Sequence, residues 1–287
     1  MHRVLAVGIA TVDIISIVNR YPAANDKIRA TQRYIQRGGN ACNTLVVLAQ
    51  LGFECTWFGT LAKDYFLDTV LNDLERYNIN HSPVVYFQEA SNPLSCITVD
   101  SSKGSRSIVH YRDLPELDYE QFKVLDWSNY DWIHFEGRNI AQTILMLELI
   151  ASSGSRPKVS IEIEKNHPHI AACIPYADVI MFSQTYVMSQ HYDSPSQFLK
   201  AHFLPDQHTA LLCAWGDKGA WGMDHTGSYH SPAVCIDKVI DTTGAGDVFN
   251  AGIINGLLSN KSLADGLTQA CILASKKCAR QNFDLDL

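Results

Sequence analysis

The chain has 287 residues, of which 46% are hydrophobic and 18% are charged, and it carries a formal net charge of −7 at pH 7. This composition excludes an intrinsically disordered protein, and the length is sufficient for a large domain with its own core. The excess of acidic residues and the absence of a Lys/Arg block argue against nucleic acid or an anionic membrane surface as a partner.

The cysteines and the start of the chain indicate the compartment. Eight cysteines are present, but no two have CxxC spacing, so they are better explained as reduced thiols than as disulfides or a zinc site. The first residues lead directly into a strand-like segment, without a basic leader and cleavage site. No apolar run reaches the ~20 residues of a membrane-spanning helix. We therefore expect a soluble, cytoplasmic protein.

Short β-rich segments alternate with helical patterns along the chain. Strands are predicted at residues 4–7, 57–60, 132–135, 159–163, 179–182 and 210–214, and helices at 41–51, 66–77, 140–152, 248–258 and 263–280. The last helix has a clear 3.6-residue apolar period, with Ser262 and Asp265 as a capping box at its start. The alternation predicts βαβ units in a mostly parallel sheet whose two faces are covered.

Two segments, at about residues 14–36 and 84–111, interrupt this alternation. Both contain β-rich runs with no helix between them, including a hairpin expected through residues 101–104. We interpret them as a small antiparallel sheet that forms an appendage. The alternative is two unrelated loop excursions. Because no linker or repeat divides the chain, residues 1–287 are predicted to form a single domain with these two segments inserted.

The segment 241–252, with the sequence DTTGAGDVFNAG, is the most informative for function. Gly244, Ala245 and Gly246 directly precede a helical pattern, and unobstructed backbone N–H groups at a helix N-terminus bind anions such as phosphate. Asp247 follows in the first turn, where its carboxylate could accept a proton from an attacking hydroxyl. The simpler alternative is a glycine-rich N-cap in which Asp247 is only a capping residue.

A second segment, residues 37–43 (RGGNACN), also precedes a helical pattern. Gly39 lets the backbone approach a ligand, and Asn40 and Asn43 share one face of a first helical turn, where amides suit sugar hydroxyls. The alternative is again an N-cap, formed by Asn40. Asp13 is a third candidate, because it interrupts an apolar strand and a buried carboxylate without partners is costly.

Together these segments resemble the PfkB/ribokinase family of sugar kinases over essentially the whole chain, and the sequence DTTGAGD before a helix is a strong signal of that family. Within the family the chain is most similar to the ketohexokinases (fructokinases), on residues 136–139, 159–165, 213–215 and 276–284. The resemblance implies a three-layer α/β/α ribokinase-like (Rossmann-like) domain with a small β-sheet lid. The inserted segments would form that lid, and a closed lid excludes water from the site.

The resemblance also implies roles for individual residues. Asp247 matches the catalytic base, and Gly244, Ala245 and Gly246 match the anion hole. The positions that match sugar-binding residues are Asp13, Gly39, Asn40 and Asn43. The positions that match the nucleotide site are Arg106, which reaches the ATP phosphates across the lid, the loop of Gly216, Asp217, Lys218 and Gly219, and Cys278 near the adenine. Arg138 and Lys165 support phosphate or substrate charge, unless they form surface ion pairs.

The expected ligands are ATP with Mg²⁺ and a ketohexose such as fructose, which would be phosphorylated at its 1-hydroxyl. The resemblance further implies a monovalent cation, K⁺, near Asp241, and a homodimer with interlocked lids in which Asn25 or Asp26 reaches the partner's sugar. The N-x-x-E motif with which many members order magnesium is absent from the aligned residues 182–187. Two alternatives remain. One is a kinase for another sugar or a nucleoside, similar to ribokinase or adenosine kinase, and the other is a catalytically silent sugar or nucleotide sensor.

Overall fold

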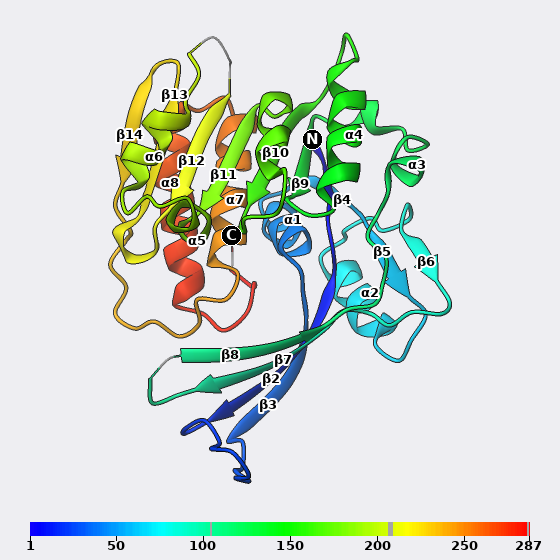
Figure 1. The fold of residues 1–287 in the computed structure, drawn as a ribbon, viewed down its shortest axis with the longest axis vertical. Coiled ribbons are helices and arrows are strands. Elements are labelled where there is room, and N and C mark those ends of the chain that lie inside the picture. The colour runs from blue at the N-terminus through cyan, green and yellow to red at the C-terminus, as the bar shows by residue number, and fades with distance from the viewer. Residues whose placement is uncertain (104, 206–208, 286) are drawn as a thin grey trace.

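The computed structural model describes residues 1–103, 105–205, 209–285 and 287, and an eight-stranded sheet runs through the centre of this part of the chain (Figure 1). The strand order is β14-β13-β12-β11-β10-β9-β1-β4. Neighbouring strands from β4 to β12 are parallel, whereas β12, β13 and β14 pair in antiparallel fashion. The strands span Arg3–Val7 (β1), Glu54–Phe58 (β4), Trp132–Glu136 (β9), Lys158–Ile163 (β10), Val179–Ser183 (β11), Ala210–Ala214 (β12), Ala220–Asp224 (β13) and Gly227–Ser231 (β14).

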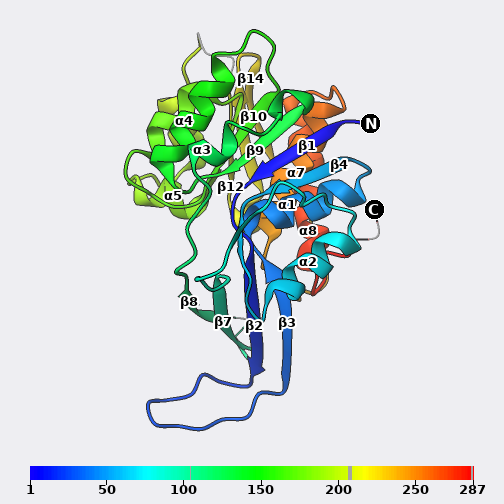
Figure 2. The same ribbon diagram turned by 90° about the vertical axis from the view of Figure 1, so that its right-hand side faces the viewer.

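Helices cover both faces of this sheet (Figure 2). On one face are α1 (Asn40–Gln50), α7 (Ala245–Leu258) and α8 (Leu263–Cys278), with α2 (Leu67–Arg76) in the same core. On the other face are α3 (Tyr119–Phe122), α4 (Ile140–Ala151), α5 (Gln184–Ser189) and α6 (Pro195–His202). Short 3-10 segments span Trp127–Asn129, Ile170–Tyr176 and Gly216–Lys218.

Side-chain alternation along the strands divides the apolar residues between two cores. In β1, Val4 and Ala6 belong to the core beneath α1 and α7, while Leu5 belongs to the core beneath α4. Because both faces of a central parallel strand meet helices, such a strand is mostly apolar along its length. This explains why these strands are recognisable in the sequence. The predicted fold class, a three-layer α/β/α domain with a small β-sheet lid, is confirmed.

The lid is a four-stranded sheet that projects from the body (Figures 1 and 2). Its order is β3-β2-β7-β8, with β2 (Thr11–Val18), β3 (Gln32–Gly38), β7 (Leu94–Asp100) and β8 (Ser105–Tyr111). The pairs β2–β3 and β7–β8 are antiparallel, but β2 and β7 are parallel. The lid is therefore a mixed sheet rather than the antiparallel sheet we predicted. Gly104, in the predicted hairpin turn, lies outside the described residues.

Other differences from the predicted elements have local causes. The lid begins at Thr11 rather than at residue 14, and the first run of the segment 84–111, β6 (Val85–Phe87), pairs with β5 (Thr60–Ala62) instead of joining the lid. Strands β13 and β14 were not predicted, because glycine and polar residues interrupt their apolar pattern. Half of the predicted capping box of α8 is present: the Ser262 hydroxyl accepts the N–H of Asp265. The Asp265 carboxylate accepts from the Ser262 hydroxyl rather than from the backbone N–H of Ser262, which a capping box requires.

Candidate active site

The N-terminus of α7 carries the residues that we predicted to form an anion cradle. Gly244 caps the helix at φ 75°, a left-handed conformation that favours glycine, and a Cβ there would lie 2.2 Å from Cζ of Phe283. A Cβ on Gly246 would meet nothing within 4 Å, so this side of the first turn is open. The N–H groups of a first helical turn have no acceptor within the helix. Together these features leave backbone donors and the positive helix end available to an anion.

The carboxylate of Asp247 is buried beside this cradle and is held by a chain of hydrogen bonds. Asn43 Nδ2 donates to Asp247 Oδ2 at 2.7 Å, and Asn43 Oδ1 accepts from Arg37 Nη1 at 2.8 Å. Arg37 is itself ion-paired through Nε to Asp73 at 2.5 Å. Asn43 therefore lies against the Asp247 carboxylate, and its amide fixes the orientation of that group.

Buried acidic residues of the parallel strands β9 and β10 lie close to Asp247. Asn40 Nδ2 donates to Glu162 Oε2 at 3.0 Å and to Glu164 Oε2 at 3.4 Å. Burial, followed by the charge of Glu136, raises the pKa of Glu162 to about 8. Burial and the charge of Glu162 likewise raise the pKa of Asp247 well above its usual value. Asp247 is therefore a stronger base than an exposed aspartate when it is ionised.

Asp13 belongs to a polar row on one face of the lid. The strand registers place Gln36, Asp13, Ser95 and His110 side by side across β3, β2, β7 and β8. Thr11 donates to Asp13 at 3.1 Å, and Ser95 Oγ is 3.1 Å from His110 Nδ1. Burial raises the pKa of Asp13. Asp13 and Ser95 of this row are buried. Burial, the largest cause, and then the charge of Arg138, just beyond β9, lower the pKa of His110.

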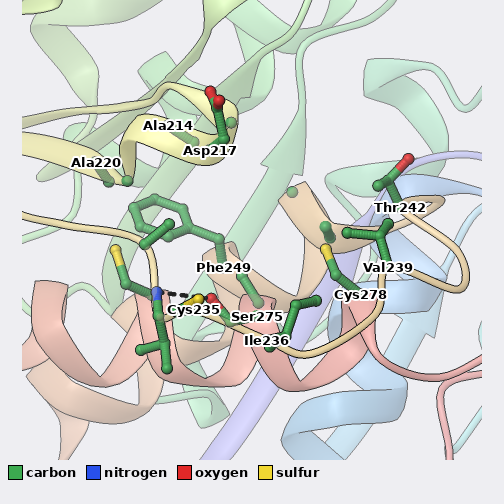
Figure 3. Close-up of a pocket in the computed structure, with 18 residues that line it drawn as sticks. Ala214, Asp217, Ala220, Cys235, Ile236, Val239, Thr242, Phe249, Ser275 and Cys278 are labelled. Carbon is green, nitrogen blue, oxygen red and sulfur yellow. Dashed lines mark hydrogen bonds between the residues drawn. The ribbon is translucent and has the colours of Figure 1, made fainter.

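An apolar cavity of about 600 Å³ borders the cradle (Figure 3). Of the predicted nucleotide-site residues, it is lined by Gly216, Asp217, Gly219 and Cys278, and the cradle contributes Ala245 and Gly246. Side chains of Ile236, Val239 and Phe249 surround it in Figure 3. Lys218 is not part of the lining: its side chain is exposed, and its carbonyl group contacts His230. Apolar walls of this kind suit an aromatic base.

The lid contacts the loop that leads into the cradle. Arg106 Nη1 donates to Thr243 Oγ1 at 2.7 Å, which joins β8 to the residue before Gly244. Arg106 is on the same lid face as Asp13, since Val99, its partner in β7, is four residues from Ser95. The face that carries Asp13 therefore also carries the arginine that reaches the cradle.

The other residues predicted to bind the substrate are Gly39, Arg138 and Lys165. Gly39 has φ 105°, and a Cβ there would lie 2.2 Å from the carbonyl oxygen of Ile9, so only glycine fits where β3 meets α1. Lys165 makes the surface ion pair named as its alternative role, with Glu164 at 3.9 Å, whereas Arg138 pairs at 2.5 Å with the buried Glu136, which is not a surface pair. The side chain of Lys165 is largely exposed.

Three further predicted residues lie outside the cradle. Asn25 and Asp26 lie in the exposed lid loop between β2 and β3, where Asp26 pairs with Arg20. Asp241 is bonded to Lys277 at 3.0 Å.

Several site residues were not predicted as such. Glu136 and Glu162 are buried acidic residues at the carboxyl ends of adjacent parallel strands, the edge of an α/β sheet at which ligands bind. His110 and Ser95 had no local signal, because their placement depends on lid pairing. Within the described residues, no group of three His, Cys, Asp or Glu side chains could hold a metal ion. No helix in the same part of the chain is long and apolar enough to span a membrane.

The fold corresponds to that of known kinase structures. Ribokinase of Arabidopsis thaliana, solved with ribose and ATP, has a TM-score of 0.80 at 18% identity, covering 98% of this chain and 93% of that one. Ribokinase of Cryptococcus neoformans var. grubii serotype A, solved with ADP, has a TM-score of 0.78 at 17% identity, covering 99% and 96%. At such identities the likeness establishes the fold alone, which is that of the ribokinases.

The family follows from the sequence comparisons. The model of the pfkB family of carbohydrate kinases matches residues 1–285. Ketohexokinase of Mus musculus is 33% identical over 291 residues, which cover 98% of this chain and 98% of the mouse protein. The chain belongs to the pfkB family, and it is a carbohydrate kinase.

Proposed function

We propose that the protein transfers the γ-phosphate of ATP to a hydroxyl of a ketohexose, converting fructose to fructose 1-phosphate, with Asp247 as the general base. One observation carries the proposal. A single helical turn exposes Gly246 to the apolar cavity and holds the buried Asp247 carboxylate against Asn43. A phosphate in the cradle and a hydroxyl beside Asp247 would therefore be adjacent.

In this proposal the nucleotide occupies the apolar cavity. The adenine would lie between walls that include Phe249 and Val239, with Cys278 at the edge, and the phosphates would extend to the first turn of α7. Arg106 already reaches Thr243 at that turn, so a small movement brings its charge to a phosphate. Mg²⁺ would be held mainly by the ATP phosphates, since it usually keeps several waters and few protein ligands, and it would neutralise phosphate charge.

The sugar would be bound between the lid and the body. Asp13 on the lid and Asn40 at the start of α1 offer a carboxylate and an amide for sugar hydroxyls. Arg138 and Lys165 add positive charge nearby, as their effect on the pKa of His110 indicates. The choice of a ketohexose is supported by the 33% identity to the mouse ketohexokinase over nearly the whole of both chains.

Asp247 would remove the proton of the attacking hydroxyl as the phosphoryl group is transferred. Its carboxylate is oriented by Asn43, and burial and the charge of Glu162 raise its pKa toward the working range of a base. The cradle N–H groups would stabilise the transferring phosphoryl group, and positioning would supply most of the remaining rate enhancement.

We also propose that the protein is a homodimer joined through its lids. On the lid face opposite Asp13, the strand registers place four residues in one row: Ile35, Ile14, Cys96 and Val109. Val109 is 72% exposed and Ile35 is 43% exposed. An apolar row of this kind on a projecting sheet suits a second copy of the same surface.

The experiment that tests the activity is ADP release from Mg·ATP with fructose, tagatose, ribose, glucose, fructose 6-phosphate and adenosine. A clear preference for fructose supports the proposal, and NMR of the product then identifies the phosphorylated hydroxyl. Faster turnover of ribose or adenosine would retain the kinase but refute the ketohexose. A folded protein that binds ATP and releases no ADP with any of these compounds would refute the proposed activity and favour a sensor.

A further inference from the structure

Lys277, in the last turn of α8, is a charged residue with no exposed surface. Its Nζ lies 3.0 Å from Asp241 Oδ2, 3.2 Å from the Asp241 carbonyl oxygen and 3.3 Å from the Arg280 carbonyl oxygen. An ammonium group has three N–H donors, so these three oxygens can satisfy all of them. A buried charge without such partners would be strongly destabilising. The local fold is therefore built around this ammonium.

The oxygens that Lys277 joins belong to two segments on which the anion cradle depends. Asp241 begins the loop that ends at Gly244, and its second carboxylate oxygen accepts the N–H of Thr243 at 2.8 Å. The N–H groups of Ile240 and Asp241 both donate to the carbonyl oxygen of Cys278. The chain end returns beneath this point, where the ring centroid of Phe283 lies 5.4 Å from Nζ.

These contacts give the ammonium a structural role at the cradle. It neutralises the Asp241 carboxylate, and it connects the end of α8 to the loop before α7. The same Phe283 ring lies where a side chain on Gly244 would have to be. Displacing Lys277 would therefore loosen both the loop and the ring that supports the first turn of α7.

We propose that the Lys277 ammonium is a covalently attached substitute for the monovalent cation that the family resemblance implies near Asp241. The residues present do not fit a bound K⁺. An ion bound to the same oxygens would be within a few ångströms of Nζ, and two positive charges repel strongly in a buried site. The protein therefore needs no K⁺ at this position, and the cradle remains formed in any salt.

The first test uses the wild-type protein. Its melting temperature and its affinity for ADP, measured by calorimetry, are compared in the chlorides of sodium, potassium, ammonium and choline at one ionic strength. We expect the ADP affinity to agree within about twofold across the four salts, because salt then acts only by screening. A saturable rise in Tm or ADP affinity confined to K⁺ would overturn the proposal. Neither readout requires phosphoryl transfer, so the result is independent of the proposed function.

The second test removes the ammonium with Lys277→Met, and Lys200→Met, at an exposed lysine in the last turn of α6, is the matched control. We expect Lys277→Met to lower Tm and to weaken ADP binding by about tenfold or more, because the Asp241 charge loses its partner. K⁺ or NH₄⁺ should partly restore both properties by occupying the vacated position, whereas Lys200→Met should behave as wild type. A Lys277→Met protein indistinguishable from Lys200→Met would also refute the proposal. If it does not fold, the wild-type comparison decides alone.

Discussion

At the scale of single residues, the proposal makes Asp247 responsible for proton removal and leaves binding to its neighbours. We expect Asp247→Asn to lower kcat by about 10²- to 10⁴-fold, the range that a general base contributes. The amide can still accept the hydrogen bond from Asn43, so the affinity for sugar should change much less. Steady-state kinetics with the preferred sugar and calorimetric titration of the same sugar measure the two effects.

Asp265→Asn is the matched control for this variant. Asp265 occupies the third position of α8, as Asp247 does in α7, and both are acidic residues in a first helical turn. A loss of stability through the helix dipole would affect both variants similarly. If Asp247→Asn retains nearly full turnover, the assignment of the base is wrong. If both variants lose activity to the same degree, the effect is on folding.

Glu162 gives a prediction about pH. Burial raises its pKa from the ordinary value of 4.5 to about 8, so the folded state binds this proton more tightly than the unfolded chain does. Folded stability therefore falls as the pH rises from about 4.5 through about 8, because the ionised group is increasingly penalised in the fold. Glu162→Gln removes that penalty and can still accept a hydrogen bond from Asn40.

Thermal unfolding of wild type and of Glu162→Gln, measured between pH 5 and pH 9 at intervals of roughly one pH unit, tests this prediction. The Tm advantage of Glu162→Gln over wild type should grow with pH and should level off above the raised pKa. Removing the charge of Glu162 should also lower the pKa of Asp247, which moves the acidic limb of kcat/KM toward lower pH. A constant difference in Tm across the range would mean that Glu162 titrates normally.

At the scale of elements, two glycines at the start of α7, Gly244 and Gly246, should respond differently to an added methyl group. A Cβ on Gly246 meets nothing in the protein, so Gly246→Ala should change stability by less than about 0.5 kcal/mol. The methyl group would nevertheless occupy the open side of the cradle and raise KM for ATP. Gly244→Ala should instead destabilise the protein by about 2 kcal/mol, from its φ of 75° and the contact with Phe283.

Denaturant unfolding and ATP kinetics on the two variants separate these effects. The expected pattern is a stable Gly246→Ala protein with weak ATP use and an unstable Gly244→Ala protein. Wild-type KM for ATP in Gly246→Ala would show that the phosphates do not approach this turn.

The elements also show what the sequence alone can predict. The cradle and Asp247 lie in one short segment in which helix start, glycines and acid are adjacent, so local rules suffice. The pairing of β6 with β5, away from the lid, depends on contacts 25 residues apart in the register Thr60 to Val85. Likewise, Lys277 reads as an ordinary basic residue near a helix end until the fold places Asp241 against it. Partners distant in sequence have no local signature.

At the scale of the whole molecule, the lid carries two different surfaces back to back. One face presents Asp13, Ser95 and His110, and the other presents the apolar row of Ile35, Ile14, Cys96 and Val109. Adjacent residues of a strand point to opposite faces, so a single sheet can serve a substrate and a partner at once. Dimerisation and sugar binding would then be mechanically connected through the same four strands.

Val109→Asp tests this arrangement, with Val124→Asp as the control, because Val109 is 72% exposed on the lid and Val124 is 80% exposed just beyond α3. We expect Val109→Asp to weaken the dimer by about 100-fold or more, since a charge in an apolar contact is unpaired there. Sedimentation equilibrium measures the mass, which should remain dimeric for Val124→Asp. Because Asn25 or Asp26 of one lid is proposed to reach the partner's sugar, Val109→Asp should also raise KM for the sugar and leave ADP affinity unchanged. A monomeric wild type would refute the dimer. A monomeric variant with the wild-type KM for sugar would show that each active site is formed by one chain alone.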